Sequence, residues 1–295
     1  MSAVDQQPPT YSRVLKQAES RAEEKGREPS AIKRLLMHHA RFGSTELLLR
    51  LDETMPDAER TAFEQSVEAY LERNVPVQYL IGVETFFGYE FQVGDGVFIP
   101  RFETEELAAA VLDEMDRQFA GAERIRILDI GTGSGCLAIT LMLEDGRVEA
   151  VATDVSKQAL HHARANCEKH GVAVDIREGD LFEPVRGERF DVVVSNPPYI
   201  PVDEPLDPAI ADYEPELALY GGDDGLDFYK RILKQVRSHL NPGAFVAFEH
   251  GAQHAAALSS YVHEALPGCR VSHQKDMQGR DRMTFVHCGS RVRHT

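Results

Sequence analysis

From residue 103 onward, segments typical of strands and helices alternate along the chain. The strand-like segments lie at 126–130, 149–153, 173–177, 190–195 and 244–249. The helix-like segments lie at 103–119, 135–144, 156–170, 226–240 and 252–266. Because strands that alternate with helices of this length form a parallel sheet with helices on both faces, the pattern predicts an α/β fold.

The last two strand-like segments, 269–275 and 282–287, interrupt this alternation. Only a few residues join them, which is too short for a crossover helix, so we expect the two strands to pair antiparallel. A mainly parallel sheet whose last strand is antiparallel is the arrangement of Rossmann-like class I methyltransferases. The predicted fold class of this region is therefore α/β with a sheet of that kind.

The first hundred residues have a different character. Helix-like segments fill residues 1–74; Asp57 opens one of them, and Ser44 stands where a helix N-cap would. Further on, the aromatic-rich run at 83–91 is separated by Gly94-Asp95-Gly96 from a short apolar run, which indicates a β-hairpin. We predict a small helical domain at 1–74, a β-hairpin linker at 75–100 and a methyltransferase domain at 101–295.

Composition narrows the class of protein. The 295 residues include 48 acidic and 32 basic side chains, a net charge of −16, whereas nucleic-acid-binding proteins normally show a basic surplus. We therefore expect no stable nucleic-acid binding. Four cysteines, at 136, 167, 269 and 288, show no C-x-x-C spacing and are expected to be reduced thiols of a cytoplasmic protein.

Two further expectations concern location and assembly. The N-terminus lacks the order of charges and apolar residues of a signal peptide, and no apolar stretch approaches the roughly 18 residues of a membrane span. No association with a membrane is therefore expected. The chain contains no coiled-coil heptads, so we expect a monomer.

A glycine loop, Gly131-Thr132-Gly133-Ser134-Gly135, connects the strand-like segment 126–130 to a helix. Glycines allow a sharp turn and the close approach of a ligand. The G-x-G-x-G spacing differs from the dinucleotide fingerprint, whose ligand places a pyrophosphate at the helix N-terminus. S-adenosylmethionine has no phosphate, and its methionyl part can pass over such a loop. An ordinary strand-to-helix turn and an NAD site remain the alternatives at this point.

Acidic residues follow the next two strands. Asp154 ends the second strand, where a carboxylate can accept hydrogen bonds from ribose hydroxyls. Asp180 and Leu181 follow the third strand, near the place expected for an adenine ring. We expect Asp180 to accept from the exocyclic amine. Together with the glycine loop, these residues form the predicted cofactor site.

The fourth strand ends in Asn196-Pro197-Pro198-Tyr199. Ligands of open α/β sheets bind at the carboxyl ends of the strands, so this motif should lie beside the cofactor. Proline has no N–H donor, so the Asn196 side-chain oxygen and the Pro197 carbonyl make the motif rich in acceptors. These two acceptors suit a planar –NH2 group, while the Tyr199 ring packs on its plane.

Such a site would align a weak nitrogen nucleophile with an activated methyl group. The predicted catalytic residues are Asn196, Pro197 and Tyr199, and the predicted substrate site is Asn196 through Tyr199. A strand-terminating turn is the purely structural alternative. No metal site is predicted, because the adjacent pairs His38-His39 and His161-His162 point apart on a helix.

Over nearly its whole length the chain resembles the bacterial release factor glutamine methyltransferases. N-P-P-Y alone is shared with adenine-N6 DNA methyltransferases, whereas the motifs around the hairpin and after N-P-P-Y are more specific. In one departure, the family often has Pro-Asp after the arginine, where this chain has Phe102-Glu103. The similar segments are 76–82, 98–105, 131–135, Asp154, 196–200, 214–219, 221–225, 249–251 and 279–282.

The resemblance implies a five-helix-type N-terminal domain for substrate recognition, a hairpin linker and a Rossmann-like catalytic domain. It implies methylation of the glutamine side-chain nitrogen in the GGQ motif of peptide chain release factors. By the same resemblance, the glycine loop, Asp154, Asp180 and Leu181 bind S-adenosylmethionine beside Asn196, and Asn196 through Tyr199 hold the glutamine amide. The segment around Arg101 is expected to help close the cofactor site.

Several alternatives stay open on the sequence. Adenine-N6 methylation of nucleic acid would use N-P-P-Y equally well but needs a basic groove and room for a flipped base. A non-catalytic adaptor of the translation machinery is the second alternative.

Residues 203–227 carry nine acids and no base, which suits either a docking surface for a basic protein loop or a solvated lid. Glu249 ends a strand on the active-site side, where an acid could aid catalysis, but we expect it to be structural. Cys136 is expected to be a small buried residue.

Overall fold

The computed structural model describes residues 8–289, and the chain divides into two compact units. The first unit runs to Gly82 and also includes Asp207–Tyr213; the second comprises Val83–Leu206 and the chain from Glu214 onward. The N-terminal segment on which the expectation of no signal peptide rests lies mostly outside the described residues. None of the helices within residues 8–289 is long and apolar enough to cross a membrane.

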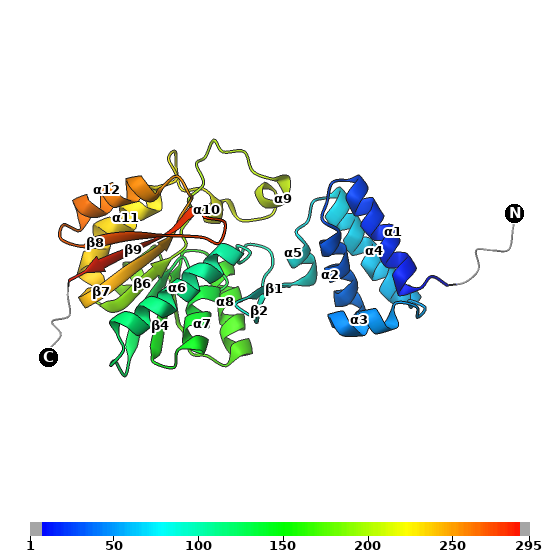
Figure 1. The fold of residues 1–295 in the computed structure, drawn as a ribbon, viewed down its shortest axis with the longest axis horizontal. Helices are drawn as coiled ribbons and strands as arrows, with labels where there is room; N and C mark the ends of the chain where they lie inside the picture. The colour runs from blue at the N-terminus through cyan, green and yellow to red at the C-terminus, as the bar shows by residue number, and fades with distance from the viewer. Residues whose placement is uncertain (1–7, 290–295) are drawn as a thin grey trace, which may run out of the picture. The chain divides into compact units, whose positions relative to one another are not determined.

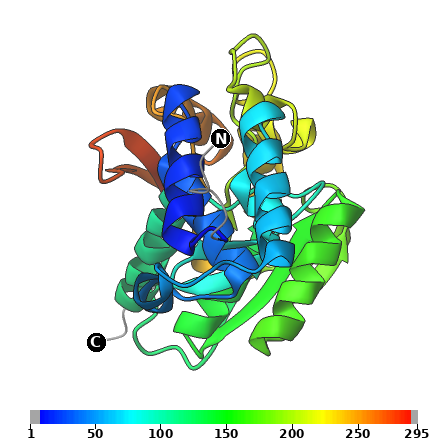
Figure 2. The same ribbon diagram turned by 90° about the vertical axis from the view of Figure 1, so that its right-hand side faces the viewer.

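The first unit is helical (Figures 1 and 2). Its buried side chains form one core that includes Leu35, Phe63 and Val67. Ser44 differs from the prediction, because it is the first residue of its helix and Gly43 occupies the N-cap position. The helices are α1 (Tyr11–Glu24), α2 (Pro29–Ala40), α3 (Ser44–Arg50), α4 (Asp57–Glu72), α5 (Val77–Ile81) and α9 (Pro208–Ala211).

The second unit contains a seven-stranded sheet in the order β5-β4-β3-β6-β7-β9-β8. All neighbouring strands are parallel except for the two pairings of β9, which are antiparallel. The prediction of a mainly parallel sheet with an antiparallel last strand is confirmed. The strands are β3 (Ile125–Ile130), β4 (Val148–Asp154), β5 (Asp175–Glu178), β6 (Phe190–Ser195), β7 (Leu240–Glu249), β8 (Arg270–Lys275) and β9 (Asp281–Cys288).

Helices cover both faces of this sheet (Figure 1). Residues of α6 and α7 bury one face, and residues of α11 and α12 bury the other, so each face has its own hydrophobic core. The helices of this unit are α6 (Phe102–Gln118), α7 (Cys136–Glu144), α8 (Lys157–His170), α10 (Glu216–Leu219), α11 (Asp227–Val236) and α12 (Ala255–Ala265), with short 3-10 turns η1 (Glu183–Val185) and η2 (Arg237–His239).

The β-hairpin is present, but its turn is not where the glycines suggested. Strands β1 (Val83–Phe86) and β2 (Tyr89–Gln92) pair antiparallel around Phe87-Gly88. Both turn residues have positive φ, 53° and 79°, which is the conformation of a tight two-residue hairpin turn. Gly94-Asp95-Gly96 instead forms a turn after the hairpin, and residues 97–100 form no strand.

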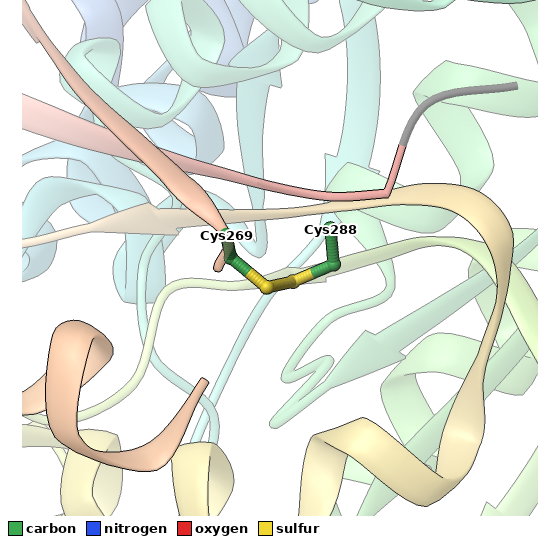
Figure 3. The surroundings of a disulfide bond; sticks show 2 residues. All are labelled: Cys269 and Cys288. Carbon is green, nitrogen blue, oxygen red and sulfur yellow. A yellow bond between two sulfur atoms is a disulfide. The ribbon is translucent and has the colours of Figure 1, made fainter. Parts of the chain in front are cut away.

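The expectation of four reduced cysteines is wrong for Cys269 and Cys288, which form a disulfide (Figure 3). The antiparallel register of β8 and β9 pairs Arg270 with His287, so the next residues outward face each other. Their Cα atoms are 4.4 Å apart, within the range that a disulfide spans. Cys136 and Cys167 are free and buried, as expected for Cys136.

Candidate active site

The cavity of interest lies at the carboxyl edge of the parallel strands. Residues that follow β3, β4, β5 and β6 line it, and its volume is about 580 Å³. Of the residues predicted for the cofactor and substrate sites, Gly135 alone is absent from the lining. The predicted residues present are Gly131, Thr132, Gly133, Ser134, Asp154, Asp180, Leu181, Asn196, Pro197, Pro198 and Tyr199.

The glycines of the loop have different roles. Gly131 and Gly133 have φ of 71° and 59°, and a Cβ added to either would meet no atom within 4 Å. These two positions therefore leave backbone open toward the cavity. Gly135 is the N-cap of α7, and a Cβ there would crowd Ile139 and Ala163 at 3.0 and 3.2 Å. Glycine is needed at position 135 for the packing of α7 against these side chains, and it does not form part of the cavity wall.

Two buried or half-buried carboxylates hold the loop. The backbone N–H of Gly133 donates to Asp154 Oδ2 at 2.9 Å, and that of Ser156 donates to Asp154 Oδ1 at 2.8 Å. The backbone N–H of Val155 is a third donor to this carboxylate, which has about four acceptor positions, so Asp154 keeps capacity for a ribose hydroxyl. The Thr132 hydroxyl donates to the buried Asp129 at 2.6 Å, and burial raises the pKa of Asp129 to about 7.

Asp180 lies in the cavity wall with a partner that the sequence did not indicate. Its carboxylate forms an ion pair with Arg231 of α11. Leu181, which has a positive φ of 50°, accepts a hydrogen bond from the Thr153 hydroxyl through its carbonyl. Asp180 is therefore less available to an adenine amine than an unpaired carboxylate would be, whereas the position of Leu181 is held by the end of β4.

Asn196 lies at the cavity end of a chain of hydrogen bonds that continues into the buried interior. Its side-chain nitrogen donates to the Thr104 hydroxyl oxygen at 3.0 Å, and that hydroxyl donates to Glu249 Oε2 at 2.7 Å. Because the nitrogen is engaged, the Asn196 side-chain oxygen remains available as an acceptor. Thr104 and Glu249 come from α6 and the end of β7. Thr104 was not singled out from the sequence, although it lies within the family-like segment 98–105.

Two close backbone approaches hold the rest of the motif. A Cβ on Gly221 would collide with the Pro198 carbonyl, and one on Gly225 would collide with the Tyr199 carbonyl. The glycines of the segment 221–225 therefore let the chain pack directly against the motif. Tyr199 is flanked by His254, with ring centroids 6.4 Å apart, and burial raises the pKa of its phenol.

An ion pair that the sequence did not predict joins two segments whose neighbouring residues, Pro100 and Pro215, line the cavity. Arg101 pairs with Glu214, whose second oxygen accepts from the Ile99 backbone N–H at 3.1 Å. Only 2% of the Glu214 side chain is exposed. Both residues lie in segments that resemble the family, but nothing in the sequence indicates that the two segments meet.

The donor set and the open loop fit S-adenosylmethionine. The Gly131 and Gly133 backbone leaves room for a ligand to lie against the loop, and Asp154 offers oxygen acceptors beside it. The cavity wall is also largely apolar beyond these groups, with Phe98, Leu137 and Phe228 among its members. Within residues 8–289, no three His, Cys, Asp or Glu side chains form a group that could hold a metal ion.

The sheet order, the antiparallel β9 and the cavity at the strand ends define a Rossmann-like class I methyltransferase. The family model described as "Methyltransferase small domain" matches residues 90–207, and the one described as "PrmC N-terminal domain" matches residues 13–82. A methyltransferase structure from Pyrococcus furiosus has a similar fold, with a TM-score of 0.51 and 20% identity over 69% of this chain and 90% of that one.

Curated relatives match at higher identity. The "Release factor glutamine methyltransferase" of Bacillus subtilis is 40% identical over 92% of this chain and 96% of its own length. The protein of the same name in Bacillus cereus is 38% identical over 92% of this chain and 97% of its own length. The chain belongs to the release factor glutamine methyltransferase family.

Proposed function

We propose that this chain transfers a methyl group from S-adenosylmethionine to the side-chain amide nitrogen of the glutamine in the GGQ motif of peptide chain release factors. Family membership supports the reaction and the class of substrate. The single observation that carries the proposal is the orientation of Asn196. Its nitrogen is engaged by Thr104, so its oxygen is free to accept from a substrate –NH2 group at the cavity.

S-adenosylmethionine, when bound, supplies a methyl group on a sulfonium. The bond from the methyl group to sulfur breaks as a bond to the glutamine nitrogen forms, so the sulfonium becomes a neutral thioether and the nitrogen loses one proton. The residues proposed to bind this cofactor are Gly131 through Ser134, Asp154, Leu181 and Asn196, with Asp180 at the adenine end. Gly135 supports the loop by closing the packing of α7. Gly133 N–H and the Asp154 carboxylate hold each other in place at 2.9 Å.

The remaining task is to hold a poor nucleophile in line. An amide nitrogen is weakly nucleophilic, and alignment in a near-attack geometry contributes up to roughly 7–11 kcal/mol in favourable systems. The Asn196 oxygen and the Pro197 carbonyl accept the two amide hydrogens, and the Tyr199 ring packs on the amide plane. Acceptors that face the nitrogen also stabilise the positive charge that develops on it.

The proposal is tested by labelled methyl transfer. The chain is incubated with S-adenosylmethionine labelled in the methyl group and with a bacterial release factor, and the labelled residue is mapped by mass spectrometry. We expect one methyl group on the glutamine of GGQ, and none on a release factor in which that glutamine is replaced. Cofactor binding without any mark on this glutamine would overturn the proposal.

Methylation of adenine N6 in nucleic acid is the competing interpretation of N-P-P-Y. It is not favoured, because the relatives are named release factor glutamine methyltransferases.

We propose that the first unit recognises the protein substrate, as the match of residues 13–82 to the N-terminal family model supports. We also propose that the protein acts as a cytoplasmic monomer without stable binding to nucleic acid. Sedimentation in the presence and absence of RNA tests both the assembly state and the absence of nucleic-acid binding.

A further inference from the structure

We propose that Thr104 and Glu249 are positioning residues that determine which end of the Asn196 amide faces the substrate, an inference that rests on the proposed glutamine methylation. Neither residue needs to touch the reacting atoms for this role. Both act through Asn196, to which they are linked in the order Glu249, Thr104, Asn196.

The direction of these hydrogen bonds follows from the single proton of the Thr104 hydroxyl. That proton is donated to Glu249 Oε2 at 2.7 Å, so toward Asn196 the hydroxyl oxygen can only accept. The Asn196 –NH2 group therefore turns to Thr104, at 3.0 Å, and its oxygen turns away. An oxygen facing the substrate can accept from a glutamine –NH2 group, whereas an –NH2 group in that place would meet it donor to donor.

Glu249 and Thr104 have little contact with solvent, although Thr104 and Asn196 border the cavity. Thr104 is 4% exposed and Glu249 is 1% exposed, so the hydrogen bond between them lies in a largely water-free environment, where it is stronger than in solvent. The backbone carbonyl of Glu249 also accepts from the Tyr229 hydroxyl at 2.7 Å, which anchors the end of β7. The charged and titratable groups that act on the Glu249 carboxyl are Arg101, Glu103, Cys136, Tyr199, Tyr229 and Arg282.

Protonation of Glu249 would reverse this chain of hydrogen bonds. Burial raises the pKa of Glu249 to about 7, and the Thr104 hydrogen bond and Arg282 only partly oppose this. A protonated Glu249 can donate to the Thr104 oxygen, so the Thr104 proton is free to turn toward Asn196. The Asn196 amide would then present its oxygen to Thr104 and its –NH2 group to the substrate. Ionised Glu249 is thus the productive form, and turnover should rise as the pH passes through about 7.

The test compares three variants with the wild-type chain, with a release factor as substrate. Thr104→Val keeps the shape but has no hydroxyl, and Thr104→Ser keeps the hydroxyl. Glu249→Gln can accept from or donate to Thr104 but has no titrating proton, so it removes the pH dependence whichever way its amide is turned. We measure kcat and KM from pH 6 to 8 and the affinity for S-adenosylmethionine by calorimetry. Melting temperatures report whether each variant is folded.

We expect Thr104→Val to lower kcat at least about tenfold with cofactor affinity changed less than about twofold, and Thr104→Ser to restore most of kcat. We expect the wild-type kcat to fall below pH 7, and Glu249→Gln to remove that fall. A Thr104→Val variant with wild-type kcat, or the same acidic fall in Glu249→Gln, would overturn the inference. A wild-type chain that marks no glutamine would instead overturn the proposed function itself.

Discussion

The guanidinium of Arg101 forms an ion pair with the carboxylate of Glu214, and it also lies over the Phe98 ring, 4.6 Å from the ring centroid. The Glu214 side chain is almost completely buried. Its negative charge is balanced by the Arg101 guanidinium and by a hydrogen bond from the Ile99 N–H. The pair joins the segment before α6 to the segment that follows N-P-P-Y. Phe98 and residues 215–219 form part of the cavity wall, so the pair sets the shape of that wall.

Replacement of Arg101 should destabilise this wall. Arg101→Met leaves the Glu214 carboxylate buried without its cation, and we expect a loss of roughly 2–3 kcal/mol in the free energy of unfolding, measured by urea denaturation. The double variant Arg101→Met/Glu214→Leu removes the buried charge as well and should recover part of that loss. Equal stability of the single variant and the wild type would show that the pair contributes nothing.

The second prediction concerns Asn196. Asn196→Ala removes the proposed acceptor for the substrate amide, and we expect kcat to fall by about 10²–10³, the loss typical of a missing transition-state hydrogen bond. The affinity for S-adenosylmethionine should change less than about tenfold, because the glycine loop and Asp154 remain. Single-turnover transfer and calorimetry measure the two quantities. Normal turnover in Asn196→Ala would contradict the assigned role.

Burial of Glu249 makes a prediction about stability as well as activity. The folded-state pKa of about 7 lies above the ordinary value of 4.5, so between these values the folded chain binds more protons than the unfolded one. This carboxyl therefore makes the folded state less stable as pH rises from about 4.5 to 7. We expect the wild type to lose roughly 3 kcal/mol relative to Glu249→Gln over that range.

Urea unfolding of both proteins at pH 5 and pH 8 measures this difference. The exposed Glu123 provides a matched control, because Glu123→Gln makes the same chemical change where no burial occurs. Its stability should follow that of the wild type at both pH values. Parallel curves for Glu249→Gln and the wild type would mean that the buried carboxyl does not titrate with a raised pKa.

The sheet could be predicted well from the sequence because each strand and helix is indicated by a local pattern of residues. Alternation of apolar strands and helices gives a parallel order, and a short last connection gives the antiparallel β9. The residues that follow the strand ends then had to meet at one edge, which is why Gly131, Asp154 and Asn196 could be assigned to one cavity. The hairpin turn was misplaced because Phe87 adopts a positive φ that aromatic residues seldom adopt.

What the sequence could not predict depends on contacts between distant segments. Thr104 is 92 residues from Asn196 and 145 from Glu249, and no local pattern links them. Arg101 and Glu214 are similarly separated by 113 residues. The Cys269–Cys288 pairing follows from the register of β8 and β9, and composition alone suggested reduced thiols. Residues in such pairs are distant in the sequence and meet only in the folded structure, so their spacing in the chain does not predict the contact.

The disulfide leads to the fourth prediction. Cys269 and Cys288 are 19 residues apart, and closing a loop of this size restricts the unfolded chain by about 3 kcal/mol in the loop-entropy treatment. We expect the Cys269→Ser/Cys288→Ser variant, or the wild type in dithiothreitol, to unfold at lower urea. Thiol titration of the denatured chain should find two thiols without reductant and four with it. Four thiols without reductant would show that the pair is reduced in solution.

The last prediction tests the acidic segment 203–227. Asp203, Glu204 and Asp212 are exposed, and their carboxylates form no ion pair within the described part of the chain. Asp207 is left unchanged, because its side chain accepts from the Ala209 N–H and caps α9. If these carboxylates attract a basic loop of the release factor, the triple change to Asn, Gln and Asn should weaken binding about tenfold at low salt and much less at high salt, where exposed charges are screened.

The control neutralises three exposed acids elsewhere, Asp113, Glu123 and Glu264, with the same change in net charge. Equal affinity of both triple variants would contradict docking and favour a solvated lid, whereas loss confined to the first triple would assign the attraction to this segment and not to the overall charge of −16.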